Sequence, residues 1–380
     1  MRIGVDAREL CGRATGVGRY LRGLLQQWSV DDPTGRHEFV LYSPEPIAAT
    51  LDARRFSTRV VSGAPGTWWE QARLPRAAAG DHLDVWFSPG YTTPLLFAVP
   101  TVVAIHDLSF VAHPEWFRLR EGLRRRWLCT QAARQARAVI TISEFSKREL
   151  IDRLDVPDAR IHVIPPGVTI APSTISHQPS IINHDVNLEG LRAEGSGLPE
   201  TPRVLFVGSI FNRRHVTDLI RAFAPIARTH PDASLDIVGD NRSFPYEDLQ
   251  SAIDTEGVPA QVQWHQYVTD EQLGGLYANA RAFAFLSEYE GLGLTPLEAL
   301  GAGVPPVLLD TAVARESCGD AAVYVPPNSL TAITQAIEAV LFDGSTRSRI
   351  LNEGPAVLAR YSWPRAGRET LAVIEDAGSA

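Results

Sequence analysis

The chain has 380 residues, of which 44% are hydrophobic and 21% charged, a composition typical of a globular protein rather than a disordered or fibrous one. Its length favours two domains. Its net charge of −8 argues against general binding to nucleic acid.

Short apolar runs alternate with longer amphipathic runs along the first half of the chain. The run "RIGVDA" predicts a first strand, and "GVGRYLRGLLQQW" predicts a helix because its apolar residues recur at helical spacing. Further strands are expected at 38–43, 85–90, 101–107, 138–143 and 160–168, with a helix at 143–154. This alternation predicts a parallel sheet with helices on both faces.

The pattern breaks at 169–202, where polar residues and scattered prolines predict a linker or a mobile loop. A second alternating series then predicts strands at 203–209, 234–240, 262–268, 280–287, 304–309 and 321–326. We therefore expect two doubly wound α/β domains, at 1–168 and 203–361, with a cleft between them. A final helix over 362–380 is expected to pack back toward the first domain.

The stretch "SEYEGLGLTPLEALGAGVPP" places two glutamates, Glu290 and Glu298, around a glycine-rich turn. Thr295 is expected to be the N-cap of the following helix, with the next proline at its first position, so Glu298 could simply complete a capping box. Gly293 lets the backbone approach a ligand closely. Free amides at a helix N-terminus suit an anion, and carboxylates suit sugar hydroxyls, so the combination suggests a nucleotide sugar.

The same stretch resembles the signature of glycosyltransferase family 4, in which two glutamates are separated by seven residues. Other segments resemble the family in the expected order, especially its mannosyltransferase-like members: "ATGVGRYLRGLL", "AIHDLSFVAHPEWF", "ITISEFSKRELI", "IHVIPPGV" and "LFVGSIFNRRHVTDLI". The resemblance covers nearly the whole chain except 169–202. It implies the GT-B fold, with two facing Rossmann-like domains, an acceptor-side first domain, and a second domain that binds the nucleotide sugar without a metal ion.

The resemblance also implies roles for residues of the second domain. Glu290 would contact hydroxyls of the donor sugar, and Glu298 would hold the ribose hydroxyls. Backbone amides of the turn would meet the sugar and the diphosphate, at Gly293, Leu294 and Thr295.

Two arginines, Arg213 and Arg214, stand where the family has an Arg-Lys pair on the diphosphate. Guanidinium groups bind phosphate oxygens in bidentate fashion and would stabilise the leaving nucleoside diphosphate. Without the resemblance, two solvated arginines at a helix start would explain the pair equally well. Arginine instead of lysine at 214 changes the geometry expected there, though not the charge.

Further candidates rest on the resemblance together with a strand-end position. Gly16 and Gly18 would face the donor phosphates, although a lone G-x-G usually marks a turn. His106 would lie near the donor sugar, although a lone histidine at a strand end is more often structural. The remaining candidates are Tyr267 and Val268 beside the base, where Tyr267 could instead be a core residue, and Asp240 lining the same cleft.

The sequence gives fewer indications of the surface that would bind the acceptor. The run 117–138 carries seven arginines, and Trp68 and Trp69 lie upstream of it. Basic amphipathic surfaces can dock on anionic membranes, but a solvated helix with core tryptophans is the alternative. No signal peptide and no run of about 18 apolar residues is evident, and three widely spaced cysteines favour a reduced compartment, so we expect a cytoplasmic protein.

The resemblance implies a retaining transferase that moves a hexose, mannose first, from a nucleotide-diphosphate sugar to a glycan or lipid-linked acceptor. GDP-mannose is the first expected donor and a UDP-hexose the second. The alternatives are a sugar-nucleotide epimerase of the same fold and a catalytically silent nucleotide-sugar-binding protein. A phosphorylase would need a lysine for pyridoxal phosphate, and Lys147, the only lysine, lies in a helix-like run of the first half.

Overall fold

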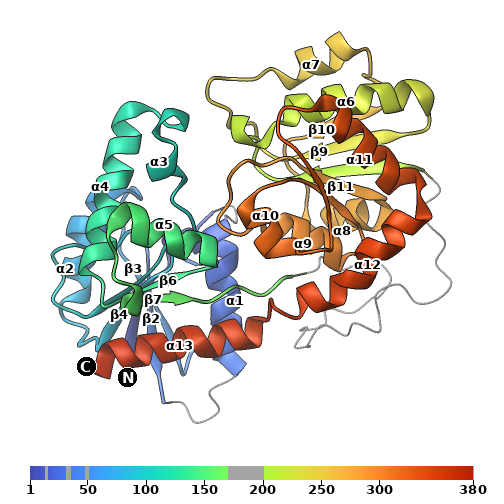
Figure 1. Cartoon of the computed structure of the whole chain (residues 1–380). Coiled ribbons are helices and arrows are strands. Elements are labelled where there is room, and N and C mark those ends of the chain that lie inside the picture. The colour runs from blue at the N-terminus through green and yellow to red at the C-terminus, as the bar shows by residue number, and fades with distance from the viewer. Residues whose placement is uncertain (13–15, 31–35, 48–50, 170–200, 380) are drawn as a thin grey trace. The chain divides into compact units, whose positions relative to one another are not determined.

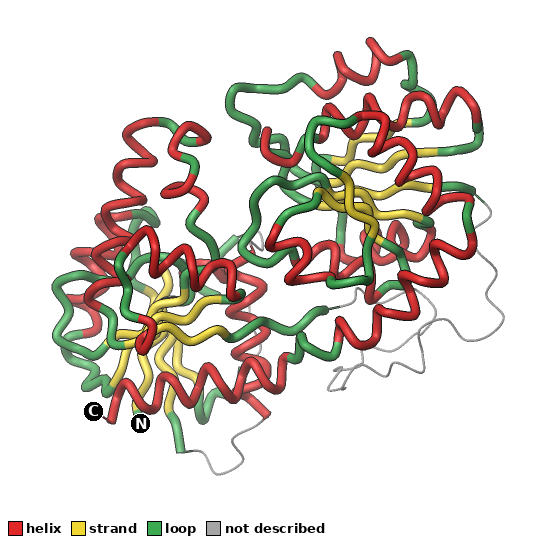
Figure 2. Tube along the Cα trace, viewed as in Figure 1, coloured by secondary structure: helices red, strands yellow, loops and turns green. Residues whose placement is uncertain are grey.

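The computed structural model describes residues 1–12, 16–30, 36–47, 51–169 and 201–379. Contacts divide the chain into two compact units, Met1–Gly167 with Tyr361–Ala380, and Val168–Arg360. Each unit has one central sheet with helices on both sides, as Figure 2 shows. The predicted linker at 169–202 lies almost wholly outside the described residues.

The first unit is built on a seven-stranded sheet of order β3-β2-β1-β4-β5-β6-β7. All neighbouring strands run parallel. The strands are β1 Arg2–Asp6, β2 Glu38–Ser43, β3 Phe56–Val60, β4 Val85–Ser88, β5 Thr101–Ala104, β6 Ala138–Thr141 and β7 Ile161–Val163. The predicted parallel sheet is therefore confirmed, and β3 is a strand that the apolar pattern did not predict.

Helices cover both faces of this sheet (Figure 1). On one face, α1 (Gly16–Val30) and α13 (Trp363–Ser379) pack on the apolar side chains of β1, β2 and β4. On the other face lie α2 (Leu74–Ala78), α4 (Leu119–Gln135) and α5 (Glu144–Leu154). The shorter helical segments of this unit are η1 Arg8–Leu10, η2 Trp69–Arg73, α3 Ser109–Ala112, η3 Pro114–Trp116 and η4 Asp158–Arg160.

Close packing joins α13 to α1, although the two helices are more than 300 residues apart in sequence. The indole Nε1 of the buried Trp28 donates a hydrogen bond to the Gly367 carbonyl at 2.9 Å. A Cβ at Gly23 would lie 2.4 Å from the Trp363 ring, so glycine is required there for the tryptophan to fit. The predicted terminal helix is thus an integral layer of the first unit.

The second unit contains a six-stranded parallel sheet of order β10-β9-β8-β11-β12-β13. Its strands are β8 Arg203–Val207, β9 Ser234–Val238, β10 Val262–His265, β11 Ala282–Phe285, β12 Pro306–Leu309 and β13 Val323–Val325. Its helical segments are η6 Asn212–Arg214, α6 Val216–Thr229, α7 Leu249–Glu256, α8 Asp270–Asn279, α9 Leu294–Gly301, α10 Ala312–Cys318, α11 Leu330–Phe342 and α12 Gly344–Leu358. In Figure 1, α6 and α11 lie on one side of this sheet, and α8 and α9 lie on the other.

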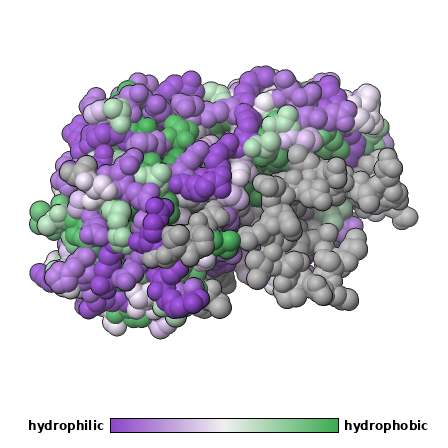
Figure 3. Space-filling model, turned by 90° about the horizontal axis from the view of Figure 1, so that it is seen from below, coloured by the Kyte–Doolittle hydropathy of each residue, from purple (hydrophilic) through white to green (hydrophobic). Residues whose placement is uncertain are grey.

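Hydrophilic residues predominate on the molecular face drawn in Figure 3, with apolar residues scattered among them. No helix in the described ranges is long and apolar enough to cross a membrane.

Replacing Trp28 with alanine should lower the free energy of unfolding of the first unit by about 3–5 kcal/mol, because a fully buried indole and its hydrogen bond are lost. Trp68→Ala is the matched control, since that side chain is 70% exposed and its loss should cost no more than about 0.5 kcal/mol. Urea unfolding followed by circular dichroism measures both. Equal effects of the two variants would contradict the role assigned to the α1–α13 contact.

Candidate functional site

The strand order of the second sheet reverses between β8 and β11, which are neighbours in the sheet. Ligands of such sheets bind beyond the carboxyl ends of the strands at this reversal. Arg214 follows β8 at the end of η6, and Glu290 follows β11. Their side chains form an ion pair in which Nε and Nη2 of Arg214 each lie 2.7 Å from Glu290 Oε1.

The Arg214 guanidinium is fixed on several sides. Its Nη1 donates to the Ser209 carbonyl at 2.7 Å, and its centre lies 5.0 Å from the Phe285 ring centroid. The side chains of Arg214 and Glu290 are only 12% and 17% exposed, so their attraction is weakly screened by solvent. Arg214 therefore holds Glu290 in one orientation.

Hydrogen bonds to Glu290 converge on one of its two carboxylate oxygens. Ser287 Oγ donates to Oε1 at 2.8 Å, and both contacts from Arg214 use the same atom. Within the described ranges, no hydrogen bond is made to Oε2 of Glu290. That oxygen can accept a hydrogen bond from a hydroxyl group of a ligand.

The segments after β8 and β11 are joined at a second point, which the sequence did not indicate. The Glu288 amide donates to the Arg213 carbonyl at 2.9 Å. The His215 ring contacts Glu288 Oε1 through Nε2 at 2.8 Å and Asp218 Oδ2 through Nδ1 at 3.1 Å. His215 adopts a left-handed conformation with φ of 48°, which turns the chain from η6 into α6. His215, directly after the two arginines, is the residue from which this second contact could have been predicted.

Arg213 directly precedes Arg214 in the chain and lies beside it. The guanidinium of Arg213 stacks 4.2 Å from the Phe211 ring centroid, a position that keeps the charge close to the carboxyl end of β8. Arg213 and Arg214 are thus both at the strand-order reversal, and their binding of a diphosphate stays a prediction.

The glycine turn begins α9 two residues earlier than predicted. Gly293, with φ of 85°, is the N-cap, and the helix starts at Leu294. The expectation that Thr295 caps this helix is wrong, because a glycine in the left-handed region turns the chain before the Thr-Pro pair is reached. Glu298 instead accepts a hydrogen bond from the Tyr277 hydroxyl of α8 at 3.4 Å.

A pocket in the second unit borders this turn. Glu290, Gly293 and Thr311 line it together with apolar side chains from β11, β12 and α10. Among the described residues that line the pocket, Glu290 alone carries a charge. The carboxylate is therefore the strongest hydrogen-bond acceptor at its wall.

The remaining candidates of the second unit also follow strands β9 and β10. Tyr267 is 66% exposed, which excludes the core role considered for it, and Val268 beside it is partly buried. Asp240 is partly exposed and accepts a hydrogen bond from Arg242 Nη2 at 3.3 Å. These residues therefore lie at the same edge of the second sheet as the Arg214–Glu290 pair.

His106, Gly16 and Gly18 belong to the first unit. The two glycines lie in the first turn of α1, not in a free loop. His106 follows β5 and is 9% exposed, with its ring edge-on to Tyr20 at 4.7 Å between centroids. Its Nε2 lies 2.7 Å from the Pro89 carbonyl, which can only accept, so Nε2 carries the proton.

Burial lowers the pKa of the His106 imidazole below its usual value of 6.5, although the hydrogen bond to Pro89 and the charge of Asp107 oppose this. Asp107 is held by the Tyr91 hydroxyl at 2.6 Å and the Ser109 amide at 2.8 Å. His106 is therefore a neutral imidazole in a fixed tautomer at neutral pH.

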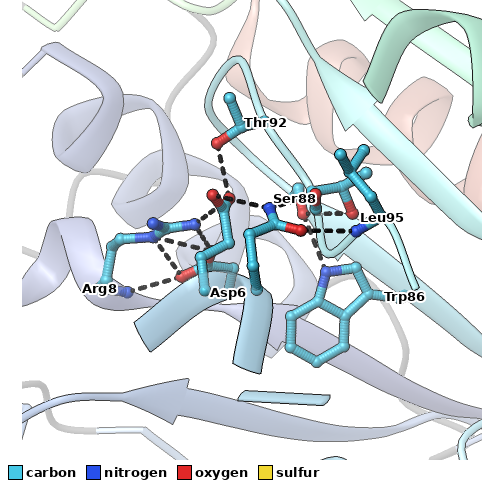
Figure 4. A network of polar contacts seen from close by, with 9 residues as sticks. Asp6, Arg8, Trp86, Ser88, Thr92 and Leu95 are labelled. Atoms are coloured by element: carbon cyan, nitrogen blue, oxygen red, sulfur yellow. Dashed lines mark hydrogen bonds and ion pairs between the residues drawn. The ribbon is translucent and has the colours of Figure 1, made fainter. Parts of the chain in front are cut away.

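The first unit contains a buried polar network at the reversal of strand order between β1 and β4, which Figure 4 shows. The sequence analysis did not predict this network. Asp6 and Glu70 both bind the Arg8 guanidinium and are 2% and 1% exposed. Burial alone would lower the pKa of Arg8, but the two carboxylates raise it above its usual value.

The same network holds the loop that follows β4. Thr92 Oγ1 donates to Glu70 Oε1 at 2.6 Å, and Gln71 binds the Thr93 carbonyl and the Leu95 amide at 3.0 and 2.9 Å. This loop begins with Pro89, the hydrogen-bond acceptor of His106. Glu70 lies in the π-helical turn η2, beside Trp69. The sequence analysis singled out only the tryptophans of this segment and not Glu70.

Two Rossmann-like units with parallel sheets define the GT-B architecture of glycosyltransferases. Sucrose-phosphate synthase of Thermosynechococcus elongatus superposes with a TM-score of 0.73 at 17% identity, over 100% of this chain and 99% of that one. The family model for glycosyl transferases group 1 matches residues 192–357, and that for Glycosyltransferase Family 4 matches residues 14–171.

Curated relatives extend the match to most of the chain. The GDP-mannose-dependent alpha-(1-6)-phosphatidylinositol monomannoside mannosyltransferase of Mycolicibacterium smegmatis is 31% identical, over 87% of each chain. The O-antigen chain mannosyltransferase B of Escherichia coli is 26% identical, over 71% of this chain and 68% of that protein. The chain therefore belongs to glycosyltransferase family 4 and is a hexosyltransferase, as its motifs predicted.

The buried imidazole should make the first unit less stable in mild acid. The unfolded chain binds a proton near pH 6.5, whereas the folded state binds it only at lower pH, so stability falls as the pH drops below 6.5. His106→Gln, whose amide can still donate to the Pro89 carbonyl, should flatten this dependence. Unfolding free energies at several pH values measure the slope, and NMR titration of the ring proton should give a midpoint below 6.5. A midpoint at or above 6.5 would contradict the assignment.

Proposed function

We propose that the protein transfers a hexose, with retention at the anomeric carbon, from a nucleotide-diphosphate sugar to a hydroxyl group of a glycan or lipid-linked acceptor. The observation that carries the proposal is the Arg214–Glu290 pair at the β8–β11 reversal, next to the glycine turn of α9. It brings a cation for phosphate and an acceptor for sugar hydroxyls to one strand edge. Family membership supports the same assignment.

Glu290 is proposed to bind a hydroxyl of the donor sugar through Oε2, since Arg214 and Ser287 use Oε1. Glu298 is proposed to hold the ribose hydroxyls, with Tyr277 orienting its carboxylate. Amides at Gly293, Leu294 and Thr295 would meet the diphosphate, because the first amides of a helix have no partner within the helix.

In the proposed reaction the bond from the anomeric carbon to the phosphate oxygen breaks, and a bond to the acceptor oxygen forms on the same face. The electron pair of the broken bond stays on the leaving diphosphate, which also takes the acceptor proton. Arg213 and Arg214 would stabilise the charge that develops there. Their charge makes a metal ion unnecessary in this proposal, and His106 remains a predicted contact of the sugar.

GDP-mannose is the first proposed donor. The relative that is 31% identical over 87% of both chains is named for dependence on GDP-mannose and for a phosphatidylinositol mannoside acceptor. A UDP-hexose is the second proposed donor.

A donor screen in EDTA tests the proposal directly. The purified protein is incubated with GDP-mannose, UDP-glucose, UDP-N-acetylglucosamine and UDP-galactose while thermal stability and nucleotide release are recorded. We expect stabilisation and slow release with GDP-mannose. A requirement for added metal would contradict the metal-independent mechanism, and failure of every donor to bind would contradict the proposed site.

Substitutions at Glu290 and Arg213 test the residue roles with the donor identified in this way. Glu290→Ala and Arg213→Ala should each lower turnover by about 10²–10³-fold, the usual effect of removing one group that stabilises a transition state. Arg228→Ala, at an arginine of α6 whose side chain is 60% exposed, is the matched control and should retain full activity. Unchanged circular dichroism spectra exclude unfolding. Normal rates in both site variants would overturn the assignment.

A further inference from the structure

The segment that follows β4 contacts His106 at two points, and we call its residues 89–95 the β4 loop. The Pro89 carbonyl accepts a hydrogen bond from Nε2 of His106 at 2.7 Å, and the Tyr91 ring lies edge-on to the imidazole with 5.7 Å between ring centroids. The Tyr91 hydroxyl also donates to Oδ2 of Asp107, the residue next to the histidine, at 2.6 Å. The position and the tautomer of the imidazole therefore depend on the conformation of the β4 loop.

The other contacts of His106 leave one ring nitrogen available. The Tyr20 ring of α1 lies edge-on to the imidazole at 4.7 Å between centroids, and Ser146 Oγ of α5 donates to the main-chain carbonyl of His106 at 3.1 Å. Within the described residues, no hydrogen bond is made to Nδ1. Because Nε2 carries the proton, Nδ1 has a lone pair that can accept a hydrogen bond from a hydroxyl group of a ligand. The opposite tautomer would lose both this acceptor and the bond to Pro89.

The β4 loop has a conformation that needs support from its surroundings. Tyr91 has a φ of 61°, in the left-handed region that residues with a side chain rarely adopt. Its amide donates to the Ala104 carbonyl at the end of β5 at 2.8 Å. Strained backbone of this kind persists only where neighbouring groups fix it, and it occurs most often at functional sites.

The π-helical turn η2 supplies this support. Thr92, directly after Tyr91, donates from Oγ1 to Oε1 of Glu70 at 2.6 Å, and Figure 4 shows the threonine joined to the buried network in this way. The Glu70 side chain is buried, and Arg8 binds the same carboxylate oxygen, so this acceptor cannot move. Gln71 holds the later part of the loop through its two bonds to the main chain.

Stability of the first unit does not by itself explain the charge at position 70. Glu70 and Asp6 share the Arg8 guanidinium, so two carboxylates are buried with one cation. The lost hydration of such a cluster largely offsets its internal attraction, and apolar residues of similar size often stabilise a fold as well. A fixed acceptor for the strained loop is the better explanation.

We propose that Glu70 is a positioning residue, which acts through Thr92 to hold the β4 loop so that His106 keeps its proton on Nε2 and offers Nδ1 as an acceptor to a ligand hydroxyl. Glu70 does not touch the reacting groups itself. The effect on turnover rests on the proposed function, in which His106 contacts the donor sugar. The effect on the imidazole does not rest on it and can be measured separately.

Nitrogen-15 NMR of the imidazole tests the positioning without any sugar donor. The signals of His106 are assigned by their absence from His106→Gln. In the neutral wild-type ring, a protonated Nε2 and an unprotonated Nδ1 should give two widely separated resonances. Thr92→Val keeps the shape of the side chain but removes its hydroxyl, so the two resonances should move toward each other as the second tautomer is populated. Thr92→Ser restores the hydroxyl and should give the wild-type spectrum.

Two further variants connect the hydroxyl to Glu70. Glu70→Ala should shift the resonances in the same direction as Thr92→Val. Combining the two substitutions should cause no further shift, because the hydroxyl acts through the carboxylate. Circular dichroism shows whether the variants are folded, and the Thr92 substitutions decide the proposal if Glu70→Ala does not fold.

Turnover with a donor from the screen gives a second measure. Thr92→Val should lower kcat about 10–100-fold, since the acceptor for a sugar hydroxyl is displaced. The KM for the donor should change less than about threefold, because the contacts of the second unit with the nucleotide are untouched. If every donor in the screen fails, the proposed function is contradicted, and the NMR comparison still decides the positioning role.

A purely structural variant of the same unit is the matched control. Tyr42→Phe removes a buried hydroxyl that donates to Asp81, so it should lower thermal stability but leave the imidazole resonances and kcat as in the wild type. A wild-type imidazole spectrum in Thr92→Val would overturn the proposal. So would equal spectral changes in Thr92→Val and Tyr42→Phe, or a loss of kcat in Thr92→Val without any change at the imidazole.

Discussion

Every strand pairing in the described part of the two sheets is parallel, and this constraint determines where chemistry can occur. Parallel strands bring all their carboxyl ends to one edge, and the reversal of strand order leaves the space there open. Both units place buried or half-buried charges at this point. In the first unit they are Asp6, Arg8 and Glu70, and in the second they are Arg214 and Glu290.

The two charge clusters differ in whether a carboxylate oxygen remains that can accept a hydrogen bond from a ligand. The carboxylate of Glu70 is occupied by neighbours within its unit, so the first cluster mainly orders the loop after β4. Glu290 has an oxygen to which no described residue donates, and it borders a pocket. An ion pair that is mostly buried is a weak source of stability, because the lost hydration offsets the attraction. The Arg214–Glu290 pair is thus better explained by orientation of a carboxylate than by stability.

The apolar runs predicted most of the fold because strands covered by helices on both faces are apolar throughout. The edge strand β3 was missed since only its first residue, Phe56, is buried and the other four are exposed. The motif with Glu290 could be found in sequence, but its contact with Arg214 joins segments 76 residues apart and depends on which strands are neighbours. The start of α9 was mispredicted because propensity at Thr295 was outweighed by the backbone freedom of Gly293.

The position of α13 has a consequence for synthesis on the ribosome. Domains usually fold from the N-terminal one onward as the chain emerges. Here residues 363–379 cover the same sheet face as α1, so the first unit lacks one of its layers until the entire second unit has been translated. The apolar surface of β1, β4 and α1 must therefore be shielded during elongation, by chaperones or by the nascent chain itself, and the unit that begins first is completed last.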